Sequence, residues 1–411
     1  MSKNDIERIT GFDRELVAIV KDFLILTPLS WPLAAQQEFL KKAEKGNYVL
    51  PKFSYAKTDY SEKIDSLKSY IKKLGKDDHP AIDFLKRNAE SYLSAYYILQ
   101  GVGTDAVTKN SKILYGSPND VFKGYKRKII SIAKYFLRVV EDYKPGNSKE
   151  NFIYSAEDFC ELLAAATNEI IDTNKDAIKI EVDENIFARA AAGPNYVKIR
   201  KNARFSEYDL RQLLHHEVFT HTLTYINGRN QPVLSCLGYT APRITGVQEG
   251  LATFAEYINF SIDIERLSRL ALRIIALSKA EDGADLVDLY KFFKSHGQSN
   301  EESYLSAMRI FRGGTPKGGI IFYKDNVYLR GLIEVESFLK SAMHDGDLRN
   351  MDLLFAGKLT TNDTLRLQPL LTEGYIEAPK YIPNWMQKKE LLAAHLALND
   401  LTERFFIKPN K

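Results

Sequence analysis

The chain has 411 residues, which is enough for two or three domains with substantial hydrophobic cores. Hydrophobic residues make up 45% and charged residues 27% of the sequence, a balance that excludes a disordered or fibrous protein. The net charge of +4 is small for this length, so the composition does not indicate a nucleic-acid partner.

The cysteines and the hydropathy of the sequence indicate the cellular compartment in which the protein is expected. Cys160 and Cys236 are far apart and form no C-x-x-C pair, so no disulfide framework is indicated. The first residues are polar, and no stretch approaches about 18 uninterrupted apolar residues. We therefore expect a cytoplasmic protein without a signal peptide or a membrane span. The sequence does not indicate its oligomeric state.

Apolar periodicity predicts helices throughout the first 150 residues. The expected helices run from Asp13 to Leu26, over residues 34–45 and 61–74, from Pro80 to Gln100, and from Asn119 or Asp120 to Tyr143. The segment Lys144-Pro145-Gly146-Asn147 then interrupts the pattern. It predicts a boundary between an N-terminal helical region, residues 1–150, and a second region, residues 151–411.

Beyond a helix expected from Ser155 to Asn174, the period of the sequence changes. Residues 177–182 and 195–200 alternate between apolar and polar side chains, which is typical of strands. Residues 187–194 are ambiguous. We expect residues 196–205 to form the edge of a small sheet, where an extended peptide could add as a further strand. An ordinary internal strand is the alternative. The pattern as a whole predicts an α+β fold that is predominantly helical.

The next segment, His215-His216-Glu217-Val218-Phe219-Thr220-His221, holds three of the protein's seven histidines. Ser206-x-x-Asp209 predicts the start of a helix, and Asn227-Gly228 predicts its end. Glu217 and His221 lie on the apolar stripe of this helix, where an uncompensated polar group is costly. A divalent metal ion is one compensation. Hydrogen bonds to core neighbours, or a solvated face, are the alternatives.

The spacing of these histidines predicts a local change in the helix. His216 and His221 are five residues apart, which leaves them roughly 140° apart on a regular α-helix. Both can bind one ion only if the helix widens between them. We therefore predict a π-bulge there, with an i→i+5 hydrogen bond.

A second helix is expected to begin at Thr245, with Thr245 as its cap and Gln248 at the third position. We assign Glu249 as the third metal ligand and Glu256, which follows it by seven residues, as a hydrogen-bonding partner behind the ligands. For Glu249, an acid stabilised by the helix dipole is the alternative. Gly250 indicates the close approach of another backbone.

The remainder of the chain is predicted to be helical. The expected helices are Asp263–Ala280, Ala284–Ser295, Ser299–Phe311 and Asp325–Ala342, followed by short helices.

Two of these segments together resemble a known family. His216-Glu217-x-x-x-His221 followed by Gln248-Glu249-Gly250-Leu251-Ala252 is similar to the microtubule-associated tyrosine carboxypeptidase family, whose bacterial members are labelled flavohemoglobin expression-modulating QEGLA motif proteins. The resemblance extends to Phe311-Arg312-Gly313-Gly314 and Lys324-Asp325-x-x-Tyr328-Leu329-x-Gly331.

The resemblance implies a zincin-like zinc metallopeptidase. His216, His221 and Glu249 match the zinc ligands, and Glu217 matches the catalytic glutamate. The animal members of the family remove a C-terminal tyrosine from tubulin. The expected substrate is therefore a peptide or protein C-terminus, and the preference for a terminal Tyr or Phe comes from the resemblance alone.

Further site residues follow from the chemistry of peptide hydrolysis. Glu217 would take a proton from water and deliver it to the leaving amine, and Tyr328 and Arg312 are candidate donors to the carbonyl oxygen. A carboxypeptidase also needs a cation for the terminal carboxylate of its substrate. The candidates for that cation are Arg312, Lys324, Arg330 and Arg243.

Three other functions stay open. One is a zinc endopeptidase or aminopeptidase, and another is a non-catalytic regulatory protein in which a metal is structural or absent. The third is an iron oxygenase with two histidines and one carboxylate as ligands, which would leave Glu217 without a task.

Overall fold

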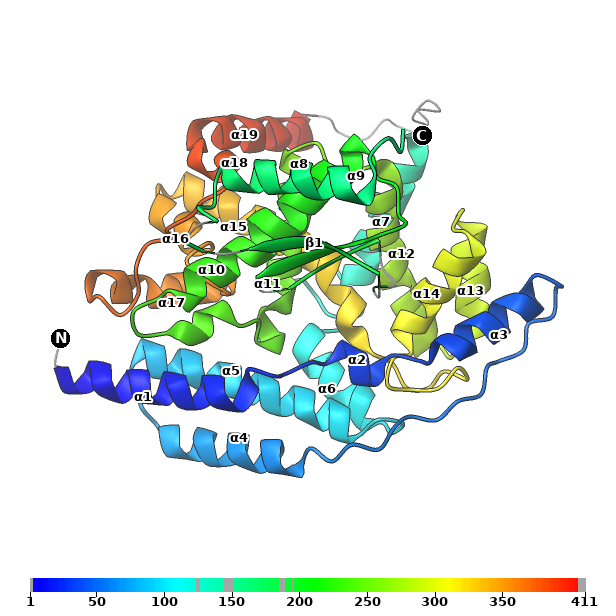
Figure 1. Cartoon of the computed structure of the whole chain (residues 1–411), viewed down its shortest axis with the longest axis horizontal. Helices are drawn as coiled ribbons and strands as arrows, with labels where there is room; N and C mark the ends of the chain where they lie inside the picture. The colour runs from blue at the N-terminus through cyan, green and yellow to red at the C-terminus, as the bar shows by residue number, and fades with distance from the viewer. Residues whose placement is uncertain are drawn as a thin grey trace.

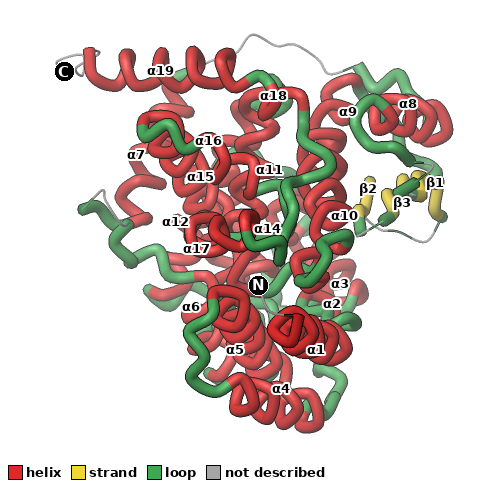
Figure 2. Tube along the Cα trace, turned by 90° about the vertical axis from the view of Figure 1, so that its left-hand side faces the viewer, coloured by secondary structure: helices red, strands yellow, loops and turns green. Residues whose placement is uncertain are grey.

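The computed structural model describes residues 3–122, 126–143 and 151–405, apart from residues 174, 177, 185, 187, 188 and 194. The described chain is predominantly helical with one small sheet, as Figure 1 and Figure 2 show. The predicted α+β class with a helical majority is confirmed.

Seven helices occupy the described part of the N-terminal region. They are α1 (Lys3–Val20), α2 (Leu26–Leu29), α3 (Leu33–Ala43), α4 (Ser61–Leu74), α5 (Pro80–Gln100), α6 (Ala106–Tyr115) and α7 (Ile129–Asp142). The prediction for α5 is confirmed at both ends, since the helix runs from Pro80 to Gln100. Pro80 takes the first helical position, and the His79 side chain accepts a hydrogen bond from the backbone of Ala81.

The start of α7 was predicted wrongly. The Asp120 carboxylate accepts a hydrogen bond from the backbone N–H of Ser117, and Val121 pairs with Lys128 in an isolated β-bridge. These contacts hold the residues before Ile129 out of helical geometry, so α7 begins about nine residues later than expected. The sequence also gave no prediction for α6.

The sheet contains β1 (Lys179–Asp183), β2 (Ala190–Ala192) and β3 (Tyr196–Arg200) in the order β1-β3-β2. The strand β3 pairs in parallel with β1 and antiparallel with β2. The prediction that residues 196–205 form the sheet edge is therefore wrong, because β3 is central. The edge positions belong to β1 and to β2, an alanine segment within the range whose periodicity was ambiguous.

The predicted metal-binding helix is continuous but changes its winding. It comprises α9 (Glu207–Leu213), a π-helical segment (Leu214–Thr222) and α10 (Leu223–Arg229). The capping box of Ser206 and Asp209 is confirmed. The predicted i→i+5 winding between His216 and His221 is also confirmed, since the π-helical segment includes both residues.

The second helix of the site, α11 (Thr245–Ile258), follows a 3₁₀ turn, Pro242–Ile244. Thr245 is its first helical residue rather than its cap, because the 3₁₀ turn runs directly into the helix and makes no side-chain cap. The helix packs closely against α15 (Val327–His344). A Cβ atom on Gly250 would lie 2.2 Å from the carbonyl carbon of Gly331, which confirms the predicted close approach of another backbone.

The remaining helices are α8 (Ala156–Asn168), α12 (Ile264–Glu281), α13 (Leu286–Ser295), α14 (Asn300–Ile310), α16 (Leu348–Leu353), α17 (Thr361–Thr372), α18 (Asn384–Gln387) and α19 (Lys389–Phe405). Short 3₁₀ turns are also present at Ser235–Gly238 and Tyr323–Asn326. No helix in the described ranges combines the length and apolar character needed to cross a membrane. The cytoplasmic location stays a prediction.

Buried side chains form two hydrophobic clusters. The first joins the N-terminal helices to α12, α13, α14 and α17, and the second joins α8 and the sheet to α11, α15 and α19. The segment Lys144–Asn147, where the boundary between two regions was expected, lies outside the described residues. The division at residue 150 therefore stays a prediction.

Candidate metal centre

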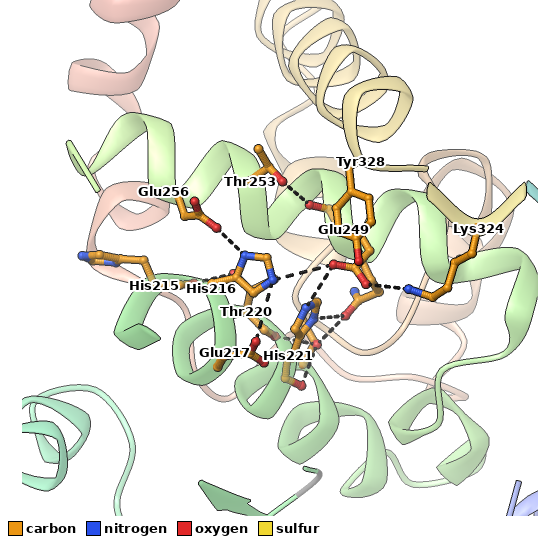
Figure 3. Close-up of polar contacts among 12 residues, drawn as sticks. His215, His216, Glu217, Thr220, His221, Glu249, Thr253, Glu256, Lys324 and Tyr328 are labelled. Carbon is orange, nitrogen blue, oxygen red and sulfur yellow. Dashed lines mark hydrogen bonds and ion pairs between the residues drawn. The ribbon is translucent and has the colours of Figure 1, made fainter. Parts of the chain in front are cut away.

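Three side chains from two helices converge in the interior of the protein (Figure 3). They are His216 and His221 of the π-helical segment and Glu249 of α11, and their ligand atoms lie within 4.8 Å of one another. Oε2 of Glu249 lies 3.7 Å from Nε2 of His216 and 3.9 Å from Nε2 of His221. These distances are too long for hydrogen bonds. Ligand atoms around a tetrahedral zinc ion with bonds of about 2.1 Å lie about 3.4 Å apart, so this set fits such an ion after a small contraction.

The widened helix explains how residues five apart can share a centre. Its winding brings the rings of His216 and His221 to a centroid distance of 5.0 Å, nearly perpendicular to each other. His215, which is adjacent in sequence, points away from this group in Figure 3 and packs edge-on against Phe219. Two of the three clustered histidines therefore face Glu249.

A buried carboxylate lies behind the first histidine. Oε1 of Glu256 is 2.5 Å from Nδ1 of His216, and Arg266 contacts both oxygens of the same carboxylate. Glu256 is fully buried, so this network holds the imidazole with Nδ1 protonated and Nε2 directed towards Glu249. This placement matches the position that we assigned to Glu256, whereas Arg266 was not identified from the sequence.

An amide takes the corresponding place behind the second histidine. Oε1 of Gln248 lies 3.5 Å from Nδ1 of His221 and accepts hydrogen bonds from Thr224 and Lys358. The Nζ atom of Lys358 also donates to the backbone carbonyl of His221 at 2.8 Å. Neither Gln248 nor Lys358 was predicted as a partner of His221. Gln248 was interpreted only as a helix-start residue, and Lys358 lies in the loop between α16 and α17, where no motif marks it.

Charge around the centre favours a bound cation. Burial lowers the pKa of His216, but the carboxylates of Glu249 and Glu256 outweigh this effect and raise it to about 10. Burial and the Lys358 ammonium lower the pKa of His221 to about 3, so this imidazole is neutral, the form that binds metals. Burial raises the pKa of Glu249, but Lys324 and His216 bring it well below the ordinary value.

Glu217 lies beside the three ligands without joining them. It lines a cavity of about 390 Å³ together with His221 and Glu249, and its Oε1 is 3.9 Å from Nε2 of His216. Burial and Glu249 raise the pKa of Glu217, and His216 opposes them. The arrangement supplies a carboxylate at the wall of the cavity, next to the position that an ion would occupy.

Three separate parts of the chain enclose this cavity. The N-terminal region contributes Val20 and the residues that follow it, together with Tyr92 of α5. The edge strand contributes Ala192 and the adjacent Gly193. The lining also contains Tyr225 and Tyr239, so aromatic rings approach the cavity from several elements.

Two further candidates, Lys324 and Tyr328, lie on the other side of Glu249 (Figure 3). Nζ of Lys324 is 3.2 Å from Oε1 of Glu249. Arg273 and Arg309 flank the Tyr328 ring, and Nη2 of Arg309 lies 3.3 Å from the Tyr328 hydroxyl. Burial and Glu249 raise the pKa of Tyr328, but the surrounding cations outweigh them and lower it.

The other three candidate cations lie apart from the cavity beside Glu217. Arg312 is near Arg309 and Asp325, and its buried Nε atom has no partner among the described residues. Arg243 and Arg330 line a different cavity of about 270 Å³. Arg243 donates to Asn88 and Asp363, and Arg330 lies 3.8 Å from Asp120. The structure does not bring Arg243 and Arg330 to the candidate centre.

A family model described as Microtubule-associated tyrosine carboxypeptidase matches residues 37–403. The chain belongs to this family. The predicted resemblance to the tyrosine carboxypeptidases is therefore confirmed, and the match includes every residue of the candidate centre.

Individual relatives are more distant. A protein of Mus musculus described as "Putative tyrosine carboxypeptidase MATCAP2" is 27% identical over 202 residues, which are 48% of this chain and 37% of the mouse protein. The match thus spans well under half of that tyrosine carboxypeptidase relative. A crystal structure of a putative lipoprotein from Colwellia psychrerythraea covers 89% of this chain and 70% of its own, with a TM-score of 0.39 and 14% identity.

Proposed function

We propose that this protein is a zinc-dependent carboxypeptidase that releases the last residue of a peptide or protein. Membership of the tyrosine carboxypeptidase family supports the reaction class. The observation that carries the proposal is the convergence of His216, His221 and Glu249 beside the unligated carboxylate of Glu217. Two histidines and a glutamate with one open position are a common ligand set of catalytic zinc.

The metal would be held by His216, His221 and Glu249. When bound there, zinc would supply Lewis-acid activation of water and of the scissile carbonyl. Glu217 takes the proton from the attacking water as the new C–O bond forms, and it passes this proton to the amine nitrogen as the C–N bond breaks. Glu256 and Gln248 keep the two imidazoles oriented throughout. Tyr328 is the proposed hydrogen-bond donor to the carbonyl oxygen.

The fold around the site is consistent with a zincin-like arrangement, which is part of the proposal. The helix that bears the histidines lies next to a small sheet, and the edge strand β2 lines the same cavity as Glu217. An extended peptide could pair with such an edge independently of its side chains. In this arrangement β2 replaces residues 196–205 as the candidate for pairing with the substrate.

The cavity lining supports an aromatic residue at the end of the substrate. Phe23, Tyr92, Tyr225 and Tyr239 all contribute to it. Aromatic rings pack favourably against one another edge-on or offset, which favours a terminal Tyr or Phe. A protein C-terminus with such a residue is therefore the proposed substrate class.

Metal analysis of the purified protein, combined with mass spectrometry of peptide products, tests the proposal. We expect about one zinc per chain and loss of a single C-terminal residue from peptides that end in Tyr or Phe. Peptides with amidated C-termini should be poor substrates. Cleavage at internal bonds or at N-termini would favour the endopeptidase or aminopeptidase alternative. Bound iron, or no metal and no cleavage, would contradict the proposal.

A further inference from the structure

Gln248, which lines the cavity, carries a buried donor without a partner among the described residues. Gln248 is 2% exposed, and its Oε1 accepts hydrogen bonds from Thr224 at 3.1 Å and from Lys358 at 3.0 Å. The ammonium of Lys358 fixes the amide orientation, because a rotated amide would place its NH₂ group against a group that only donates. Nε2 is then directed elsewhere and has no hydrogen-bond partner among the described residues. Buried donors without an acceptor are rare in folded proteins.

The neighbouring lysine has donor capacity to spare. An ammonium group carries three protons, and among the described residues Nζ of Lys358 has two acceptors, the His221 carbonyl and Oε1 of Gln248. Lys358 is 5% exposed and lines the cavity with Gln248 and Glu217.

The loop that bears Lys358 is fixed in place. The backbone N–H of Lys358 donates to the carbonyl of Leu237 at 2.6 Å. The preceding carbonyls of Phe355 and Ala356 accept hydrogen bonds from Asn227 and Gln231 of the adjoining helix and turn. A cation held this firmly loses little entropy when it binds a ligand.

We propose that Lys358 and Nε2 of Gln248 bind the α-carboxylate of the last residue of the substrate. This inference rests on the proposed carboxypeptidase function. A carboxylate has two acceptor oxygens, and these two residues, which both line the cavity, offer one cationic and one neutral donor. The bound carboxylate would accept hydrogen bonds from the orphan amide donor and from the lysine ammonium.

The other cations fit this task less well. Lys324 is already in contact with Glu249, and Arg243 and Arg330 line a different cavity. Lys21 lines the same cavity as Lys358 but is exposed. Lys358 is thus the buried lysine of the cavity that contains Glu217.

The test compares Lys358→Gln with Lys21→Gln as the matched control from the same cavity. Each protein is assayed on a peptide that ends in tyrosine and on its C-terminally amidated form. We expect Lys358→Gln to lower kcat/KM for the free acid by about 100-fold, since it removes a buried charge partner. Its kcat/KM for the amide should fall by much less, so that the preference for the free acid is lost, and its metal content should be retained. Lys21→Gln should retain the preference for the free acid.

A binding measurement supplies a readout besides activity. In the Glu217→Gln background, acetyl-tyrosine should bind more tightly than acetyl-tyrosine amide, and Lys358→Gln should abolish this difference. Lys358→Arg keeps the charge and should retain part of the preference. The inference is overturned if Lys358→Arg loses the preference entirely. It is also overturned if Lys358→Gln lowers kcat/KM equally for the free acid and the amide, or if it loses the metal, because Lys358 would then only position His221. If the unmodified protein ignores amidation, the carboxypeptidase proposal itself fails.

Discussion

Gly250 and Gly331 bring the backbones of α11 and α15 into direct contact. A Cβ atom on Gly250 would lie 2.2 Å from both the carbonyl carbon and the carbonyl oxygen of Gly331. A Cβ atom on Gly331 would lie 2.0 Å from the carbonyl oxygen of Gly246. Because Glu249 precedes Gly250 on the same helix, this contact helps to set the position of the candidate third ligand.

The first prediction concerns this contact. Gly250→Ala should destabilise the protein by about 2 kcal/mol or more, because the neighbouring atoms belong to the backbone and cannot move without separating the helices. Gly246→Ala is the matched control, since its Cβ atom would meet no atom within 4 Å on the same helix. The control should be neutral or stabilising by up to about 1 kcal/mol. Urea denaturation measures the free energy of unfolding of both variants. Equal destabilisation would show that the contact between Gly250 and Gly331 is not the cause.

The second prediction separates proton transfer from metal binding. Glu217→Gln should retain the metal, because Glu217 lies outside the ligand set. It should lower kcat by about 10²- to 10⁴-fold, the usual contribution of a general base. Metal analysis and a peptide-release assay on the same preparation check both statements. A variant that loses its metal would show that Glu217 is a ligand.

The third prediction concerns the carboxylate behind His216. Glu256→Gln should weaken metal binding by about 10- to 100-fold, because Glu256 orients the ligand from the far side of the ring. Glu265→Gln, at a side chain that is 81% exposed, is the control and should leave the affinity unchanged. Competition with a zinc chelator measures both affinities. An unchanged affinity in Glu256→Gln would contradict the role assigned to this network.

The fourth prediction concerns pH. Burial raises the pKa of Asp176, but hydrogen bonds from Lys380, Asn230, Tyr381 and Arg229 outweigh it, so the pKa lies below its ordinary value. The unfolded chain therefore binds a proton more readily than the folded protein. The stabilisation is present above the ordinary aspartate pKa of about 4 and is lost as the pH falls towards the folded value.

Asp176→Asn should accordingly lower stability at neutral pH and flatten the loss of stability on acidification. Thermal denaturation between pH 7 and about pH 2 follows both curves, whose separation should shrink as the pH falls below about 4. Asp345→Asn is the control, because the Asp345 side chain is 65% exposed. Curves that stay parallel at every pH would show that Asp176 contributes by packing rather than by charge.

The sequence predicted the parts of the site that depend on local spacing. The five-residue separation of His216 and His221 is incompatible with shared ligation on a regular α-helix, so the π-helical winding followed from geometry. Strand order was beyond reach, because the alanines of β2 have no periodicity that distinguishes an edge from a centre. Lys358 was also missed, since its role depends on contacts with Leu237, His221 and Gln248, which are distant in sequence.

The N-terminal helix α1 leads directly into one wall of the cavity. Asp13 anchors this helix by accepting hydrogen bonds from the backbone of Ser235 and Cys236, and Val20 and Phe23 then line the cavity. These residues precede position 37, where the match to the family model begins, whereas all the candidate ligands lie within it. One wall of the cavity thus comes from residues that precede the family match, whereas Tyr92, Tyr225 and Tyr239 on its other walls lie within the match. Substitutions at Val20 or Phe23 should therefore reshape the cavity without altering the candidate ligands.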